Sequence, residues 1–390
     1  MKHTPRIALF THDTFGLGHV RRSLHLIKRL AQKLPDAPIL LLTGSPALEF
    51  FKELPPHADL VKIPTVVKTG SQNSRPPHLP LDIKEVIRMR RAIIEKTLLC
   101  FAPDLFIVDN FPLGSNKELL KPLEALKKTG CKTILGIRDI VDAPEVVRKD
   151  WTKKNMYNIL ETYYDKILIY GLKEIFDSPK EYGFSQSLQE KCRFTGFITH
   201  TIPTKSAGRL QILATGGGGG DAYPLFDALL DTAAILPKKH FTIILGPLMG
   251  NQDKERLRLK SCSLKNVVLK DYLPDLGSHF ANAEIVIGMC GYNSAAEIVS
   301  SGARAVIVPR TWRFGEHEKK NFVNEEKEQI FRGKMLANAG FATLLEQHLL
   351  SPETLRKAIE TELSRKTQAS RLPLEGLENA ATEIMELLPK

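Results

Sequence analysis

The chain has 390 residues, 43% of them hydrophobic and 25% charged, with a formal net charge of +11 at pH 7. These values are typical of a soluble globular protein of about two domains. No apolar run approaches a membrane span, and Ile7–Phe10 is too short for a signal peptide. The five cysteines include no Cys-x-x-Cys pair, which predicts reduced thiols in a cytoplasmic protein and argues against a disulfide or zinc framework.

The positive charge is concentrated in the first half of the chain. Residues 1–200 contain 31 Lys and Arg against 22 Asp and Glu. Such a surplus favours an anionic partner: nucleic acid, a membrane face or a phosphorylated substrate. Aromatic and basic residues are not interleaved as in single-strand binders, so we expect no nucleic acid.

Residues 1–198 alternate strand and helix. Strands are expected at 6–10, 38–43, 103–109, 132–138 and 166–171, and helices at 24–34 and 47–53. The Pro-rich stretch 64–80 predicts a loop, and 81–101 predicts a long helix with a basic face. That basic face is either an ordinary solvent-exposed helix surface or a docking surface for a partner. The alternation predicts a doubly wound parallel sheet.

A second sheet is expected after residues 199–208, which we interpret as a linker. Strands are predicted at 210–214, 241–245, 266–269, 284–287 and 304–308, and Ser351-Pro352 begins a helix. The sequence therefore predicts an α/β protein with two Rossmann-like domains, an N-terminal one at 1–198 and a C-terminal one at 209–390 that includes the C-terminal helices.

Five consecutive glycines, Gly216–Gly220, follow the first strand of the second domain, and Asp221 is expected to cap the next helix. No Lys-Ser/Thr follows, which excludes a Walker A loop. The next strand ends without an acidic residue, which disfavours NAD. The remaining role for the glycine run is to let the backbone approach a ligand closely, and we expect Gly217 and Gly218 to make that approach.

Further along, the apolar run 283–288 leads into Gly291-Tyr292-Asn293-Ser294 and a helix that contains Glu297. We expect Asn293 or Ser294 to cap this helix. A helix that starts at a glycine turn presents amide groups and a positive dipole to an anion such as a diphosphate. Glu297 could accept hydrogen bonds from ribose hydroxyls, whereas the ordinary interpretation is a solvated residue on a core helix.

In the first domain, Gly18-His19 follows the first strand and Asp109 ends another. The carboxyl ends of parallel strands share one edge, where open α/β folds bind ligands. A histidine oriented by a carboxylate is a common general base. A helix-capping or solvent-exposed His19 is the alternative.

These motifs together resemble the GT-B glycosyltransferases, in particular the family of the N-acetylglucosaminyltransferase that forms lipid II and the diacylglycerol galactosyltransferases. The resemblance implies two domains facing across a cleft. It implies that Leu273 reads the uracil ring, that Gly291, Ser294 and Glu297 hold diphosphate and ribose, and that Glu328-Gln329 face the donor sugar. Gly18-His19 matches the loop with the proposed base, and Asp109 its acidic partner.

The sequence also departs from that family. Glu328 replaces the first Gln of its pair, so the donor sugar need not be N-acetylglucosamine. Thr311–Lys327 is an extra charged stretch, and the Arg that binds phosphate after Thr195-Gly196 has no counterpart. The acceptor half matches only in its first loop.

The resemblance implies an inverting, metal-independent transfer of a sugar from a nucleotide diphosphate, with His19 as base and Asp109 as its support. No metal site and no cofactor are expected, because the nucleotide sugar is a substrate and the chain contains no Asp-x-Asp. The positive charge of the first half favours an anionic glycolipid or lipid-phosphate acceptor at the cytoplasmic membrane face, and a neutral soluble acceptor is the alternative. A nucleotide-sugar hydrolase and a non-catalytic sugar-nucleotide-binding subunit remain alternatives.

Overall fold

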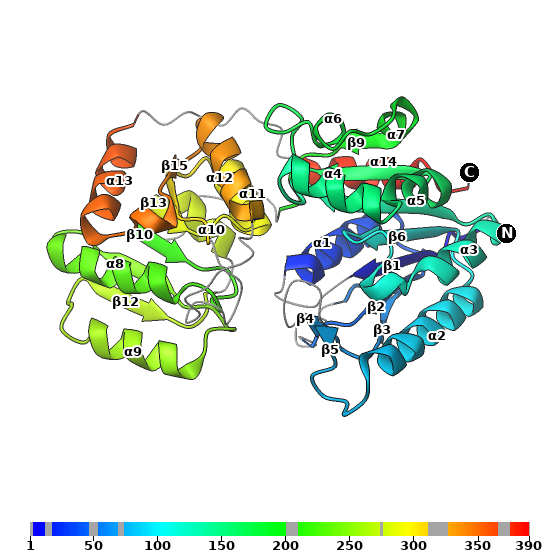
Figure 1. The fold of residues 1–390 in the computed structure, drawn as a ribbon, viewed down its shortest axis with the longest axis horizontal. Coiled ribbons are helices and arrows are strands. Elements are labelled where there is room, and N and C mark those ends of the chain that lie inside the picture. Colours follow the sequence, from blue (N-terminus) through cyan, green and yellow to red (C-terminus); the bar gives the residue numbers. More distant parts are fainter. Residues whose placement is uncertain are drawn as a thin grey trace. The chain divides into compact units, whose positions relative to one another are not determined.

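The computed structural model describes residues 3–11, 18–46, 54–68, 74–199, 210–273, 276–310, 327–365 and 375–389 (Figure 1). It contains two compact units, one made of residues 1–198 with 375–390 and one of residues 199–374. Each unit has its own parallel sheet with helices around it, so the predicted fold class is confirmed. The predicted helix at 47–53, residues 200–208 of the predicted linker and residues 311–326 of the charged stretch lie outside the described residues.

The sheet of unit 1 has seven parallel strands in the order β3-β2-β1-β6-β7-β8-β9. The strands are β1 (Ile7–Thr11), β2 (Ile39–Thr43), β3 (Ala58–Lys62), β6 (Leu105–Asp109), β7 (Lys132–Arg138), β8 (Lys166–Tyr170) and β9 (Cys192–Phe194). The helices are α1 (Gly18–Lys33), α2 (Ile83–Phe101), α3 (Leu120–Thr129), α4 (Pro144–Lys153), α5 (Met156–Tyr163), α6 (Ser178–Glu181), α7 (Gln186–Lys191) and α14 (Gly376–Met385). Sequence analysis did not identify the edge strands β3 and β9.

Burial explains why the central strands are recognisable in the sequence. Every residue of β1, β6 and β8 is buried, as expected for parallel strands covered on both faces. The predicted loop at 64–80 contains a short antiparallel pair, β4 (Val67–Lys68) and β5 (Ser74–Arg75). Helix α2 begins two residues later than predicted because Asp82 and Glu85 form a capping box at its N-terminus.

The sheet of unit 2 has six parallel strands in the order β12-β11-β10-β13-β14-β15. The strands are β10 (Leu210–Thr215), β11 (Phe241–Ile244), β12 (Val267–Lys270), β13 (Ala283–Gly288), β14 (Ala305–Ile307) and β15 (Thr343–Leu344). The helices are α8 (Tyr223–Ile235), α9 (Asn251–Ser261), α10 (Leu276–Asn282), α11 (Tyr292–Ser301), α12 (Lys327–Asn338) and α13 (Pro352–Ser364). The predicted start of the helix at Ser351-Pro352 is confirmed, and Ser351 caps α13.

The last helix corrects the predicted domain boundaries. We expected all C-terminal helices to belong to the second domain, but α14 belongs to unit 1 and packs against α1 (Figure 1). Its Ala380, Ala381 and Ile384 are fully buried. Glu378 forms ion pairs with Arg29 and Lys33 of α1. These contacts are made by residues far apart in sequence, so local periodicity does not reveal them.

Both sheets have a topological switch point, where successive crossovers leave in opposite directions. In unit 1 it lies between β1 and β6, and in unit 2 between β10 and β13. Open α/β sheets bind ligands at the carboxyl ends of the strands at this point. Within the part of the chain that the structure describes, no helix is both long and apolar enough to cross a membrane.

Candidate active site

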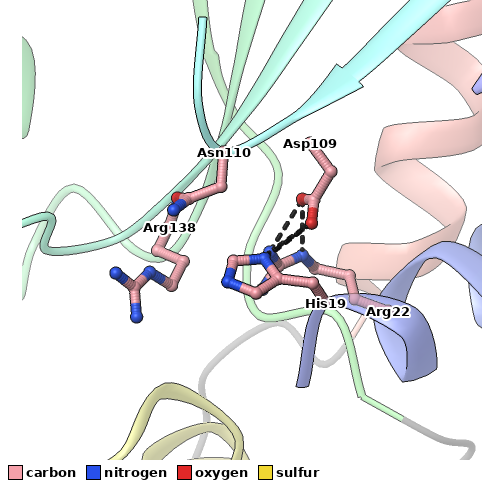
Figure 2. Close-up of polar contacts among 5 residues, drawn as sticks. All are labelled: His19, Arg22, Asp109, Asn110 and Arg138. Carbon is pink, nitrogen blue, oxygen red and sulfur yellow. Dashed lines mark hydrogen bonds and ion pairs between the residues drawn. The ribbon is translucent and has the colours of Figure 1, made fainter. Parts of the chain in front are cut away.

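The switch point of unit 1 brings His19 and Asp109 together. Strands β1 and β6 are paired so that Thr11 lies opposite Asp109, the last residue of β6. His19 lies in the first turn of α1, the helix that follows β1. Its Nδ1 is 2.8 Å from Oδ2 of Asp109 (Figure 2). The structure therefore places the two residues in contact, although they are 90 positions apart in the sequence.

Sequence analysis missed a third member of this group, Arg22. Its Nε donates to Oδ1 of Asp109 at 3.0 Å, and its Nη2 donates to Oδ1 at 2.7 Å and to Oδ2 at 2.9 Å. Arg22 is one turn after His19 on α1 and is 3% exposed. A signal was present in the sequence, because Arg22 falls on the buried face of α1 with Leu26 and Leu30.

The charge state of Asp109 determines which nitrogen of His19 carries the proton. Burial alone would raise the pKa of Asp109, but Arg22 and His19 outweigh it, and the pKa is lowered. The carboxylate is therefore ionised. Two groups lie within hydrogen-bond distance of Nδ1: Oδ2 of Asp109 at 2.8 Å and Nη2 of Arg22 at 2.9 Å. Because Nη2 already donates to both oxygens of Asp109, we assign the proton to Nδ1, where it makes a charge-assisted hydrogen bond to the carboxylate. The other ring nitrogen, Nε2, then has the lone pair that a general base needs.

Asn110 shapes the edge beside this pair. It has a φ of 73°, which is unusual for a residue other than glycine. Its backbone nitrogen donates to the carbonyl of Gly136 at 2.7 Å, and its Oδ1 accepts from the backbone nitrogen of Arg138 at 3.3 Å. Asn110 thus links the ends of β6 and β7 and sets the position of Arg138 near the His19 ring (Figure 2).

At the switch point of unit 2, the glycine run forms the turn after β10. Gly217 and Gly219 have positive φ values of 63° and 89°. A Cβ on Gly219 would lie 1.9 Å from the carbonyl oxygen of Leu245, whereas one on Gly217 would meet none of the described residues within 4 Å. Packing therefore requires Gly219, and Gly217 faces open space. The backbone oxygen of Gly218 accepts a hydrogen bond from the nitrogen of Leu248 at 2.7 Å.

Asp221 does not cap α8, contrary to expectation. The N-cap of that helix is Ala222, without a side-chain hydrogen bond. The Asp221 carboxylate instead forms an ion pair with Arg310, which follows β14. Because β10 and β14 flank β13 on either side, this pair spans the turn where β13 meets α11.

The cap of α11 also differs from the prediction. Gly291 is the N-cap, in extended conformation, and the helix has no side-chain cap hydrogen bond. Asn293 and Ser294 therefore lie in the first turn and do not cap it. The first amides of a helix have no partner inside the helix, so this end is suited to bind an anion. Glu297 lies in the next turn and is half-buried.

The remaining predicted residues lie around the same edge. Leu273 follows β12 and is 9% exposed. Glu328 and Gln329, in the first turn of α12, are also buried. Glu328 pairs with Arg332 at 2.9 Å, and Gln329 Oε1 accepts from the backbone nitrogen of Arg310 at 3.3 Å. Among the described residues, no group of three or more His, Cys, Asp or Glu side chains is arranged to hold a metal ion.

The match to a protein family lies mainly in unit 2. Residues 212–388 match the glycosyltransferase family 28 C-terminal domain. Two bacterial relatives, both named UDP-N-acetylglucosamine–N-acetylmuramyl-(pentapeptide) pyrophosphoryl-undecaprenol N-acetylglucosamine transferase, are similar over nearly the whole chain. The protein of Alkaliphilus metalliredigens is 21% identical, over 95% of this chain and 94% of its own. That of Bacillus thuringiensis is 22% identical, over 96% of each.

Solved glycosyltransferase structures share the fold of the chain. MurG of Acinetobacter baumannii has a TM-score of 0.62 at 14% identity, over 98% of this chain and 99% of that one. The calicheamicin glycosyltransferase CalG4 has a TM-score of 0.65 at 16% identity, over 100% of this chain and 99% of that one. The chain is therefore a glycosyltransferase of the GT-B fold, and its residues 212–388 match the family 28 C-terminal domain.

Proposed function

We propose that the enzyme transfers a sugar from a uridine diphosphate donor to a hydroxyl group of a lipid-linked acceptor, with inversion and without a metal ion. The observation that carries this proposal is the His19–Asp109 contact of 2.8 Å at the switch point of unit 1. The names of the relatives supply the donor and acceptor classes, a UDP-sugar and an undecaprenol-linked sugar.

In the proposed reaction, Nε2 of His19 removes the proton of the acceptor hydroxyl as its oxygen attacks the anomeric carbon. The bond from that carbon to the diphosphate oxygen breaks, and UDP leaves. Attack on the side opposite the leaving group inverts the anomeric configuration. Asp109 holds the imidazole and stabilises the imidazolium that forms.

In unit 2, the N-terminus of α11 would stabilise the departing diphosphate through its amide groups and dipole. The cap geometry at Gly291 supports this role, because Gly291 has no side chain with which to cap the helix. Glu297 would accept from the ribose hydroxyls, and Leu273 would contact the base. The backbone at Gly217 would approach the donor, since a Cβ at this position would meet no described residue within 4 Å.

We further propose that α2 rests on an anionic lipid surface at the cytoplasmic face of the membrane. Leu79 and Leu81, which precede α2, and Met89 of α2 are 38%, 40% and 41% exposed. Lys84 and Arg88 of α2 are also exposed. Exposed apolar side chains among basic ones suit a membrane interface, where the first insert and the second meet lipid head groups.

The test is turnover of the purified protein with a panel of UDP-sugars, with and without polyprenyl-diphosphate-linked acceptors. We expect transfer to require the acceptor, to produce the inverted linkage, and to fall by at least about a hundredfold in His19→Ala. Donor hydrolysis that is independent of acceptor would identify a nucleotide-sugar hydrolase instead. Donor binding without turnover on any acceptor would identify a non-catalytic binding subunit.

A further inference from the structure

Arg22 is buried at the switch point of unit 1, where its guanidinium contacts both Asp109 and Tyr170. Its guanidinium carbon lies 5.2 Å from the centre of the Tyr170 ring. Tyr170 ends β8 and is 1% exposed. A Cβ at Gly136 would lie 2.0 Å from the Tyr170 hydroxyl. The absence of a side chain at Gly136 thus leaves room for Tyr170. The Tyr170 ring in turn packs against the guanidinium that donates hydrogen bonds to Asp109.

The contacts of Arg22 change the charge balance of the His19–Asp109 pair. A histidine that faces only a buried carboxylate gains from becoming charged, and its pKa rises. Here Asp109 already has a buried cationic partner in Arg22, which contacts both of its oxygens. The pair of Asp109 and Arg22 is neutral, so an imidazolium would add an uncompensated charge to the buried site.

The charged groups that act on His19 come from three elements: Arg22 on α1, Asp109 on β6 and Arg138 on β7. The pKa of His19 is lowered, first by burial and then by Arg22 and Arg138, while Asp109 opposes them. The direction of this pKa shift agrees with the neutral charge of the Asp109–Arg22 pair, which leaves an imidazolium at His19 uncompensated.

We propose that Arg22 is a positioning residue that neutralises Asp109 and thereby keeps His19 uncharged and ready to accept a proton at Nε2. The proposal rests on the proposed function, since it assumes that His19 is the base. It distinguishes this enzyme from one in which histidine and aspartate act alone, where imidazolium is favoured before the acceptor binds.

The first experiment measures His19 directly by side-chain ¹⁵N NMR titration of the full chain. The signal of His19 among the 11 histidines is assigned by its absence in His19→Gln. We expect Arg22→Met to raise the titration midpoint of His19 by about one pH unit or more, because loss of a nearby cation favours imidazolium. We expect Asp109→Asn to lower the midpoint, because the carboxylate no longer favours the charged ring.

Two further variants keep the test decisive. Arg22→Gln retains hydrogen-bonding groups next to Asp109 without the charge, and it should raise the midpoint as Arg22→Met does, even if the methionine variant fails to fold. Arg29→Gln is the matched control, because Arg29 lies on α1 and pairs with Glu378 away from Asp109. Its midpoint should equal that of the unmodified protein.

The activity profile separates this proposal from the proposed function. The acid limb of kcat/KM for sugar transfer should move to higher pH in Arg22→Gln, in step with the NMR midpoint. If the midpoint moves but no variant and no unmodified protein transfers sugar, the proposed function fails while the role of Arg22 holds. An unchanged or lowered midpoint in both Arg22 variants, alongside His19-dependent transfer, would overturn the role of Arg22.

Discussion

Arg332 of α12 is fully buried and donates through Nη1 to the carbonyl oxygen of Cys290, 3.1 Å away. Cys290 directly precedes Gly291, the N-cap of α11. The same guanidinium pairs with Glu328 at 2.9 Å. Arg332 therefore ties α12 to the turn that presents the N-terminus of α11, and Glu328 supplies its counter-charge.

This arrangement predicts that Arg332→Met destabilises unit 2 by about 3–5 kcal/mol, because Glu328 would be left buried without its cation. The measurement is scanning calorimetry, in which the transition of unit 2 is identified by its upward shift with UDP. Arg356→Met is the control: Arg356 pairs with Glu360 on α13 in a partly exposed i,i+4 bridge, which contributes under about 1 kcal/mol. Equal losses in the two variants would contradict the assignment.

Replacement of Glu297 by Ala should weaken UDP binding by about 1.5–3 kcal/mol, the range for hydrogen bonds to a charged group. The fold should survive, because Glu297 is only half-buried. Isothermal titration calorimetry with UDP measures the change. Glu360→Ala, on the exposed side of α13, should bind UDP as the unmodified protein does. Unchanged affinity in a folded Glu297→Ala variant would remove this residue from the nucleotide site.

Sugar transfer should continue in excess EDTA. We expect the amide groups at the start of α11 and the backbone of the glycine run to supply the positive potential that a divalent ion provides elsewhere. The measurement compares initial rates before and after chelation and after addition of Mg²⁺ or Mn²⁺. Complete loss with EDTA, reversed by either metal, would refute metal independence.

Membrane docking through α2 predicts that binding to vesicles follows their anionic lipid content and weakens with salt, since exposed charges are screened over about 8–10 Å. The double variant Lys84→Glu/Arg88→Glu should lose at least about 2 kcal/mol of binding energy, roughly 30-fold in affinity. Lys149→Glu/Lys153→Glu reverses two exposed charges of α4 and is the matched control. Co-sedimentation that ignores lipid charge would leave a soluble acceptor as the better hypothesis.

The stability of unit 1 should fall as the pH drops below 6.5, the ordinary pKa of histidine. Burial lowers the pKa of His19 in the folded state, so between that value and 6.5 the unfolded chain binds more protons, and stability rises with pH. Asp109 adds a second loss of stability at lower pH. Because its pKa is lowered in the folded state, Asp109 stabilises the fold above about pH 3.8, and this stabilisation is lost as the pH falls through the pKa of the folded state. Melting temperatures at pH 7 and pH 5 should differ less in His19→Gln.

The sequence was sufficient for elements that a continuous local pattern defines. Strand β6 is an uninterrupted apolar run that ends in Asp109, because both faces of the sheet are covered. His19 and Asp109 could be paired in advance because strand ends of a parallel sheet share one edge. The contact between them confirms that geometric expectation, while their chemical role remains a prediction.

What the sequence did not reveal depends on single backbone conformations or on distant packing. Gly291, and neither Asn293 nor Ser294, caps α11, because the cap is the residue whose backbone is extended just before the first helical turn. Arg22 shares the buried face of α1 with Leu26 and Leu30, which is a signal of burial but does not name its partner. A long cationic side chain such as Arg22 or Arg332 can also reach solvent from an apolar helix face. Only the positions of Asp109 and Cys290 in three dimensions identify them as buried partners.

The return of α14 to unit 1 bears on how the protein is synthesised. Unit 1 is interrupted in sequence by unit 2, and the helix that covers α1 is translated after every described segment of unit 2. Domains usually fold in the order in which they leave the ribosome. Here α1 is synthesised early, but α14, the helix that covers it, follows only after the described segments of unit 2. Deletion of Gly376–Met385, or a bulky group introduced there, would therefore disturb the support of α1, the helix that bears His19, while leaving unit 2 intact.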